Sequence, residues 1–309
     1  MDVFIQQLLN GLVVGSIYAL IALGYTMVYG ILQIINFAHG EVVMMGAMIT
    51  ISAINLLSAG GVNLPGPLLV LAGMLLAMPV TMLIGFLIER VAYRPLRKAP
   101  RLAPLITAIG ISIVLQQIAV LIWKNNPRSF PNVLPQEPHN ILGASITDLQ
   151  IVIVLLALLI MAGLLVMVEK TKLGRAMRAV SMNQAVAGLM GVNINYVISM
   201  TFVIGSGLGA IAGVMIGANY GLAYPTMGFM IGLKAFTAAV LGGIGNLAGA
   251  VVGGILLGIV ESVGAGYLGP LTGGVLGSQY QDIFAFMVLI LVLVLRPSGL
   301  LGERVAERA

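Results

Sequence analysis

The chain lacks cysteine and carries little charge. Its 309 residues include no Cys and two His, and only 8% are Asp, Glu, Lys or Arg. Disulfides and thiolate metal sites are excluded by the missing thiols. A soluble globular domain carries about 25% charged residues, so the low charge excludes a soluble fold as well.

Motifs for nucleotide binding and hydrolysis are also absent. The sequence contains no G-x-x-x-x-G-K-[ST], no H-E-x-x-H and no G-x-S-x-G, so we expect neither ATP binding by a P-loop nor these hydrolase sites. The net charge of +5 does not indicate nucleic acid, because the cations fall between apolar stretches. We expect a non-catalytic chain without a cofactor, metal or nucleic acid of its own.

Hydrophobic residues dominate what is present. They make up 60% of the chain, and its mean hydropathy is +1.09. This predicts an all-α, polytopic bundle in membrane lipid, a single transmembrane domain over 1–309, with about eight or nine spans, some broken or re-entrant. The apolar stretches run about Leu8–Ile31, Val42–Leu57, Leu68–Ile88, Leu102–Trp123, Leu149–Val168, Tyr196–Ala218, Gly228–Gly242, Leu247–Val263 and Ile283–Leu295.

Basic residues predict the orientation of the spans, because cytoplasmic loops are enriched in Lys and Arg. They cluster in 89–101, in 169–195 and after Leu295, so we expect these regions in the cytoplasm and the proline-rich loop 124–147 outside, extended rather than helical. The start, MDVFIQQLLNG, has no basic n-region and predicts a retained span. Nine crossings would place Met1 outside. If the first or second segment is re-entrant, eight crossings would place it inside.

The carboxy-terminal half is constrained by the same orientation. Tyr196–Ala218 should run outward, so an odd number of crossings must return the tail to the cytoplasm. We therefore expect 228–263 to form two passes or a re-entrant pair, with a break at Leu241–Asn246 (LGGIGN).

Glu169–Asn195 is a polar segment between two apolar ones. It holds Glu169, Lys170, Lys172, Arg175 and Arg178, which must stay in water because each costs roughly 2.5–3.5 kcal/mol at a bilayer centre. Its 176–180 and 185–190 stretches are good helix formers with apolar side chains. We interpret it as one or two surface helices on which a partner docks, with an ordinary linker as the alternative.

Glycine recurs at helical spacing. Gly205, Gly209, Gly213, Gly217 and Gly221 are four residues apart, and Gly245, Gly249 and Gly253 repeat the pattern. Such stripes let helix backbones approach closely in lipid, which favours packing inside a bundle or across a subunit interface over a cofactor role.

Two polar constellations interrupt the apolar stretches. In Gln33–Met48, Asn36, His39 and Glu41 surround Gly40, which would permit a backbone break. Broken helices at membrane depth are where transporters place substrate or gates. A plain cytoplasmic turn between two spans is the open alternative.

The second constellation lies in Lys234–Gly254. Lys234 is inside an apolar stretch, with Thr237 one turn away and Asn246 at the glycine break. A lysine at this depth needs a carboxylate or carbonyl partner, and Glu41 and Glu261 are available. A structural ion pair is favoured over a substrate contact. For a translocation path the candidates are Asn36, His39, Glu41, Lys234, Thr237 and Asn246.

Several segments resemble the branched-chain amino acid ABC transporter permeases, and among these the Liv-type H subunit. The resemblance covers nearly the whole length and rests on GSIYALIALGYTMVYGILQIINFAHGE (15–41), ERVAYRPLR (89–97), GRAMRAVSMN (174–183), KAFTAAVLGGIGNLAGAVVGG (234–254) and RPSGLLG (296–302). It implies a multi-pass inner-membrane importer subunit for leucine, isoleucine and valine. The implied partners are an M-type permease, two cytoplasmic ATPase subunits that hold ATP and magnesium, and a periplasmic amino acid binding protein.

The resemblance also implies a loop that contacts the ATPase and moves in an alternating-access cycle. Importers often have E-A-A-x-x-x-G there, whereas Ala185–Gly191 reads AVAGLMG, with Ala185 in place of the Glu. We therefore expect coupling through shape and basic charge, by Gly174, Arg175, Arg178, Leu189, Met190 and Gly191. Alternatives are a urea or short-chain amide permease, which shares similar blocks, and a stand-alone ion-coupled transporter with Glu41, Lys234 and Glu261 as a relay.

Overall fold

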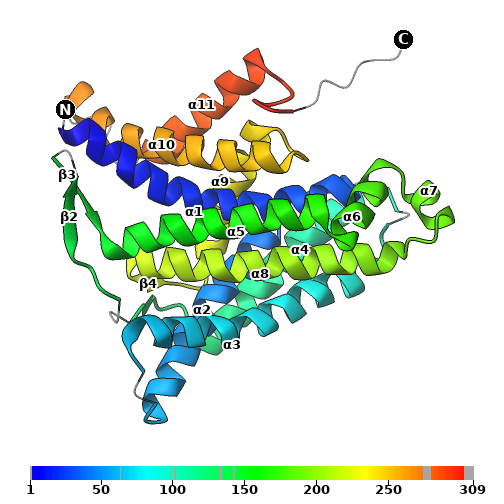
Figure 1. Cartoon of the computed structure of the whole chain (residues 1–309), viewed down its shortest axis with the longest axis horizontal. Helices are drawn as coiled ribbons and strands as arrows, with labels where there is room; N and C mark the ends of the chain where they lie inside the picture. Colours follow the sequence, from blue (N-terminus) through cyan, green and yellow to red (C-terminus); the bar gives the residue numbers. More distant parts are fainter. Residues whose placement is uncertain are drawn as a thin grey trace.

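The chain forms a helical bundle with short strands at one end (Figure 1). The computed structural model describes residues 2–62, 64–97, 99–100, 102–131, 134–141, 143–273 and 280–302. Within these ranges, seven helices are long and apolar enough to cross a membrane. They are α1 (Asp2–Leu32), α2 (His39–Ala59), α3 (Gly66–Leu87, continued by the π-helical η1, Ile88–Tyr93), α4 (Leu102–Trp123), α5 (Asp148–Lys170), α8 (Ile194–Tyr220) and α10 (Leu247–Leu271).

Four shorter helices are present in the part of the chain that the structure describes. Two of them, α9 and α11, are apolar, whereas α6 and α7 form the link between α5 and α8. Each of the apolar stretches expected from the sequence coincides with a helix, which confirms the all-α membrane fold. The bounds are α6 (Lys172–Met182), α7 (Gln184–Leu189), α9 (Met227–Gly242) and α11 (Gln281–Leu295).

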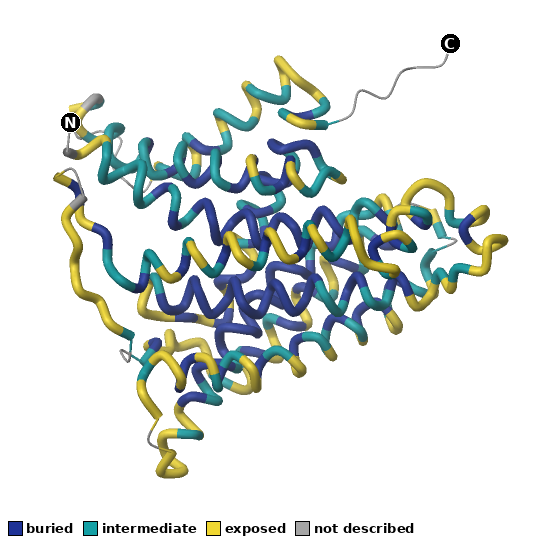
Figure 2. Tube along the Cα trace, in the orientation of Figure 1, coloured by how far each residue is buried: buried dark blue, intermediate teal, exposed yellow. Residues whose placement is uncertain are grey.

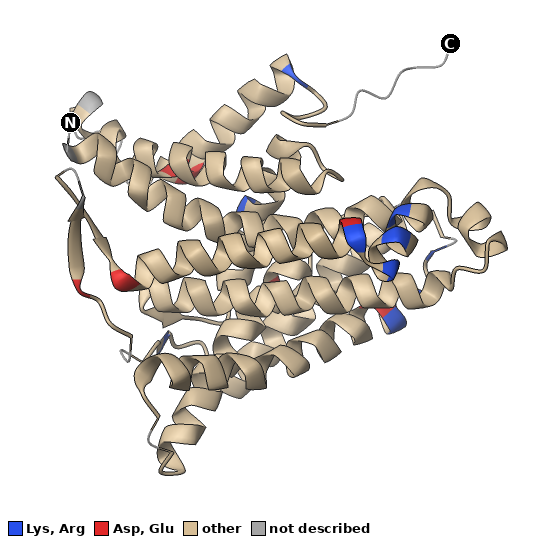
Figure 3. Ribbon diagram, in the orientation of Figure 1, with Lys and Arg blue, Asp and Glu red and all other residues tan. Residues whose placement is uncertain are grey.

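Basic side chains gather at the end of the molecule where α6 lies (Figure 3). We call it the basic end and define it by Lys170, Lys172, Arg175 and Arg178. The expected basic positions Lys98, Arg101, Arg304 and Arg308 lie outside the described residues.

The amino terminus lies at the opposite end. Gln6 Nε2 donates to the Ser145 carbonyl at 2.9 Å, and the Ser145 N–H donates to Gln6 Oε1 at 2.7 Å. Ser145 belongs to a hairpin of β2 (Pro138–Ile141) and β3 (Ala144–Thr147) in the proline-rich loop. The first helix therefore starts beside that loop and runs to the basic end, which is the arrangement of the nine-crossing alternative.

The proline-rich loop is extended, as expected. Besides the hairpin it contains β1 (Arg128–Ser129), which pairs in antiparallel fashion with β4 (Leu222–Ala223) after α8. Thr147 then starts α5 with a capping box, in which its side chain accepts from the Gln150 N–H. These contacts hold the loop across the end of the bundle, so it joins α1, α5 and α8 there.

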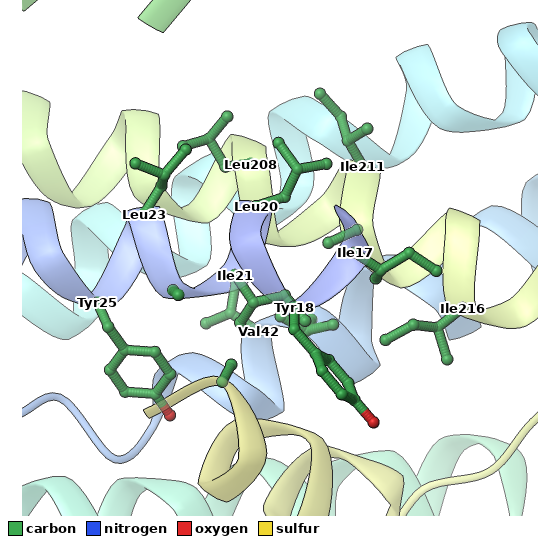
Figure 4. Close-up of a cluster of buried hydrophobic side chains, with 14 of the residues drawn as sticks. Ile17, Tyr18, Leu20, Ile21, Leu23, Tyr25, Val42, Leu208, Ile211 and Ile216 are labelled. Carbon is green, nitrogen blue, oxygen red and sulfur yellow. The ribbon is translucent and has the colours of Figure 1, made fainter. Parts of the chain in front are cut away.

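Helix α1 is the centre of the bundle (Figure 2). Every residue from Gly15 to Val28 is buried. Its side chains interleave with α8 and α2, as Figure 4 shows for Leu20 and Leu23 beside Leu208. Its mean hydropathy is the lowest of the seven candidate spans, whereas α5, the most apolar of them, is largely exposed, as expected if the outer helices of the bundle face lipid.

On its other side α1 packs against α10 through glycines of both helices. A Cβ atom at Gly15 would lie 2.7 Å from Ile255 Cα, and one at Gly11 would lie 2.6 Å from Ile259 Cα. Gly258 of α10 faces the Gly15 backbone in return. Since real Cβ contacts this short do not occur, only glycine permits the observed backbone separation.

The glycine stripe on α8 also permits close packing, at those of its glycines that lie within the helix. Gly209 and Gly213 face Val43 of α2, and Gly217 faces Phe130 of the loop. Including Gly221 in the stripe was wrong, because this residue ends α8 in the left-handed conformation with φ 71°. The stripe therefore serves packing within this chain.

The second glycine series, Gly245, Gly249 and Gly253, also contains both packing and turn residues. Gly249 and Gly253 pack α10 against Gly242 of α9, whereas Gly245 lies between the two helices with φ 99° and faces open space. The break expected at Leu241–Asn246 is confirmed as the tight connection between α9 and α10.

Candidate functional site

Two interrupted elements meet in the interior of the bundle. Helix α2 begins at His39 and α9 begins at Met227, and their first turns touch through glycines. A Cβ at Gly40 would lie 2.7 Å from Gly232 Cα, and one at Gly228 would lie 2.7 Å from the Gly40 carbonyl oxygen. We call this contact the α2–α9 junction.

From the junction the two helices run to opposite ends. Trp123, at the end of α4 away from the basic end, donates to Ser52 Oγ of α2 at 2.7 Å. Helix α9 ends against the tail at the basic end, where a Cβ at Gly243 would lie 2.7 Å from Gly302 Cα. The α2 crossing therefore combines this helix with the non-helical segment 33–38. The α9 crossing combines that helix with the non-helical segment 221–226.

The junction is deep. His39 lies against Gly24 of α1, eight residues before α1 ends at Leu32, which corresponds to about 12 Å along the helix. Helix α9 has 16 residues and spans about 24 Å, less than the ~30 Å hydrocarbon core. The structure therefore shows a broken element in 33–48, and the break precedes His39 instead of falling at Gly40.

His39 is a packing residue. A Cβ at Gly24 would overlap its ring and lie 2.6 Å from Cε1, and Gly205 and Gly209 of α8 also face Cε1. Tyr25 contacts it edge-on, with centroids 4.9 Å apart. Within the described residues no group of three or more His, Asp or Glu could hold a metal ion, so the glycines around His39 are explained by the space its ring occupies.

Asn36 and Glu41 are buried and hydrogen-bonded by other helices. Asn36 Oδ1 accepts from the Tyr93 hydroxyl at 3.0 Å. Glu41 Oε1 accepts from Ser112 Oγ at 3.2 Å and from Gln116 Nε2 at 2.7 Å. Ser112 and Gln116 were not among the candidates, although their polarity within the apolar α4 is a signal that could have identified them.

The second oxygen of Glu41 lies at the start of α9. It has no hydrogen-bond partner among the described residues and points at Gly228. The residue before α9, Thr226, makes no side-chain capping bond. Because the first N–H groups of a helix carry partial positive charge, a carboxylate at this position favours the start of α9.

Lys234 forms a three-residue ionic cluster. Its Nζ lies 2.7 Å from Glu261 Oε1 and 2.7 Å from Asp282 Oδ1. Of the two expected carboxylates, Glu261 is the partner and Glu41 is not. Asp282 was missed because the last apolar stretch was taken to start at Ile283. The cluster links α9, α10 and α11 and carries one more negative than positive group.

Thr237 and Asn246 occupy two further places. Thr237 is buried in α9. Asn246 caps α10 by accepting from the Gly249 N–H at 3.1 Å and donates to the Leu301 carbonyl at 2.9 Å. Asn246 therefore lies at the basic end, on a groove of about 930 Å³ that Arg178 also lines. The six path candidates thus lie at the junction, in α9 and at the basic end, and not in one site.

The basic end carries an exposed apolar surface on α6 and α7. Both helices exist as expected, and Gly191 ends α7 in the left-handed conformation with φ 85°. Leu189 is 88% exposed, Met190 80% and Met182, which was not a candidate, 89%. Exposed apolar patches of this kind mark contacts with another protein or with a membrane surface.

Three other coupling candidates join α6 to α5. Gly174 packs against the carbonyls of Met167 and Val168, with no room for a side chain. Arg178 donates to the Val168 and Glu169 carbonyls, and Arg175 donates to the Lys170 carbonyl at 3.2 Å. Basic groups at a helix carboxyl end are stabilising, so these residues fix how the α6–α7 surface is presented.

An apolar bundle with two interrupted helices meeting in its interior, and an exposed apolar helical surface at one end, has the architecture of a multi-pass membrane permease. Residues 7–293 match the family model for the permease component of the branched-chain amino acid transport system. The chain belongs to this family.

Relatives of similar length support the assignment. The high-affinity branched-chain amino acid transport system permease protein BraD of Pseudomonas aeruginosa is 48% identical, covering 99% of this chain and 98% of that protein. LivH of Escherichia coli K12 is 44% identical over 99% of this chain and 97% of its own length. A probable LivH of Methanocaldococcus jannaschii is 26% identical, covering 96% of this chain and 92% of that protein.

Proposed function

We propose that the chain is the non-catalytic membrane-spanning subunit of an ATP-driven importer for branched-chain amino acids, located in the inner membrane. The observation that supports this most directly is the α2–α9 junction, in a chain whose relatives are named as permeases of such systems. No cofactor is expected for this family, so the ATP and magnesium would be held by partner subunits.

In this proposal the whole chain is one transmembrane domain. The loop 124–147 faces the outside, and 89–101 and 169–195 face the cytoplasm. The positive-inside rule supports this orientation, because the α6 cations lie at the end where Arg97 donates to Asn195 at the start of α8.

The translocation path runs past the junction. Asn36, Glu41 and Thr237 are its polar groups, and His39 holds the helices around them. Lys234 and Asn246 would lie toward its two mouths. Glycine contacts between α2 and α9 allow the two half-crossings to slide or separate without moving bulky side chains, which is the kind of two-state element that alternating access requires.

The α6–α7 surface receives the ATPase. Leu189, Met190 and Met182 provide apolar contact, and Gly174, Arg175, Arg178 and Gly191 set the position of the helices. The other partners are an M-type permease and a periplasmic amino acid binding protein.

The test is uptake of radiolabelled leucine by proteoliposomes that contain the complete complex and the binding protein. We expect uptake that requires ATP and both permeases, with isoleucine and valine as competitors. Uptake by this chain alone, driven by an ion gradient, would show a stand-alone transporter. Competition by urea or acetamide without competition by valine would show an amide permease.

A further inference from the structure

A pocket of about 370 Å³ lies between the end of α8, the start of α9 and the first turn of α11. It lies toward the end away from the basic end. Met227 and Ile231, the neighbours of the junction residues Gly228 and Gly232, place it directly beside the α2–α9 junction. Its polar lining is unusual for a membrane helix bundle. It consists of Tyr18, Tyr220, Tyr224, Lys234, Gln281 and Asp282.

Charges of both signs are present at this pocket, with an excess of carboxylate. Lys234 Nζ has three hydrogens. It donates one to Glu261 Oε1 at 2.7 Å and forms an ion pair with Asp282, whose Oδ1 lies 2.7 Å away. One ammonium hydrogen is left for a ligand. Asp282 is 29% exposed whereas Glu261 is 6% exposed, so Asp282 is the carboxylate that a ligand can reach.

The three tyrosines add a surface that suits a cation. Lys234 Nζ already lies over the Tyr18 ring, 5.9 Å from its centroid. Tyr220 and Tyr224 are exposed and line the same pocket. An ammonium group is attracted to the faces of aromatic rings, and an unbalanced carboxylate beside such rings is a recognisable ammonium site.

The remaining wall is apolar and flexible. Ile216, Met227, Met230 and Ile231 line it. Methionine adapts to branched aliphatic groups of different shape because its side chain is unbranched. A volume of about 370 Å³ falls within the range of small-ligand pockets.

We infer that this pocket binds a zwitterionic aliphatic amino acid. Asp282 and the tyrosines hold its α-ammonium group, the free hydrogen of Lys234 holds its carboxylate, and the methionine-containing wall holds its side chain. The inference rests on the proposed import function and adds to it a substrate site within the membrane subunit, in the half of the bundle that faces the binding protein.

The test is direct binding of tritiated leucine to the complete membrane complex in nanodiscs, without the binding protein. We expect saturable binding in the millimolar range or tighter. Isopentylamine, which lacks the carboxylate, competes, and 4-methylpentanoate, which lacks the ammonium group, competes much more weakly. Asp282→Asn weakens leucine binding by about tenfold, the loss expected for one charge-assisted hydrogen bond, and abolishes the preference for the amine.

Paired variants separate recognition from folding. Tyr220→Phe keeps the ring and is expected to bind like the wild type, whereas Tyr220→Leu loses affinity. Asp148→Asn removes a half-buried carboxylate at the same end, paired with His139, and should bind normally. The inference is overturned if the intact complex shows no leucine binding, if sodium or potassium alone displaces it, or if both analogues compete equally. ATP-dependent uptake in those cases would leave the proposed function standing.

Discussion

The carboxylate of Glu41, on α2, lies directly against the backbone of Gly228 in the first turn of α9. One side chain thus connects two interrupted helices, and it is itself held by Ser112 and Gln116 of α4. Helices α2, α4 and α9 are therefore linked by polar contacts in a largely apolar part of the bundle.

Gly228→Ala should disrupt this contact. The new Cβ would overlap Glu41 Oε2 and lie 2.7 Å from the Gly40 carbonyl oxygen, and overpacking of this kind costs about 1–3 kcal/mol. We expect a lower melting temperature of the purified complex and reduced leucine uptake. Gly163→Ala is the matched control, because nothing lies within 4 Å of a Cβ there. If the two variants had the same melting temperature, the close contact of α2 with α9 at Gly228 would be contradicted.

Lys234→Met should destabilise the chain by about 3–5 kcal/mol, because it leaves Glu261 and Asp282 buried or half-buried without their cation. Folded yield and thermal unfolding in detergent measure the effect. Adding Glu261→Gln to Lys234→Met should restore part of the lost stability, because it removes one uncompensated charge. If the double variant is less stable than Lys234→Met, the cluster is not held by this ion pairing.

Leu189→Asp should weaken association with the ATPase without affecting the fold. The side chain is 88% exposed, so little packing within the chain is lost, but a charge would then enter an apolar contact. Co-purification of the ATPase and uptake should fall together while the melting temperature is unchanged. Leu102→Asp is the control, since Leu102 is 68% exposed on α4 rather than on α6–α7.

Arg175→Glu combined with Arg178→Glu tests the second part of the coupling surface. Both arginines donate to carbonyls at the end of α5, and carboxylates there would repel these carbonyls. We expect loss of ATPase co-purification and of uptake. If ATPase co-purification and leucine uptake were both unchanged, these arginines would have no part in coupling.

The absence of native cysteine makes the orientation easy to test. Ser129→Cys lies in the exposed loop and Ser181→Cys lies on the exposed face of α6. A membrane-impermeant maleimide added to intact spheroplasts should label Cys at 129 and not at 181, and lysis should expose 181. The reverse pattern would contradict both the membrane orientation and ATPase docking on α6–α7.

The sequence was sufficient for features that depend on local composition. Long apolar stretches located the helices, and a buried lysine required a carboxylate, which Glu261 supplies. Glycine spacing predicted close packing on α8, where Gly213 meets the α2 backbone and Gly209 and Gly217 make room for side chains of α2 and the loop.

Features that depend on distant pairing were missed. Nothing in the residues near Glu41 indicates that α4 supplies Ser112 and Gln116. Spacing of four also included Gly221 and Gly245, whose positive φ values place them in turns. Periodicity cannot distinguish a glycine that packs from one that ends a helix.

The enclosed position of α1 has a consequence for biogenesis. This helix is synthesised before α8 and α10, which cover its two sides and follow it by more than 150 residues. Until they emerge from the ribosome, the glycine surface of α1 faces lipid or an insertase without its intended neighbours. A chain interrupted before α10 would leave that surface bare, so quality-control proteases should remove such fragments far faster than the finished protein.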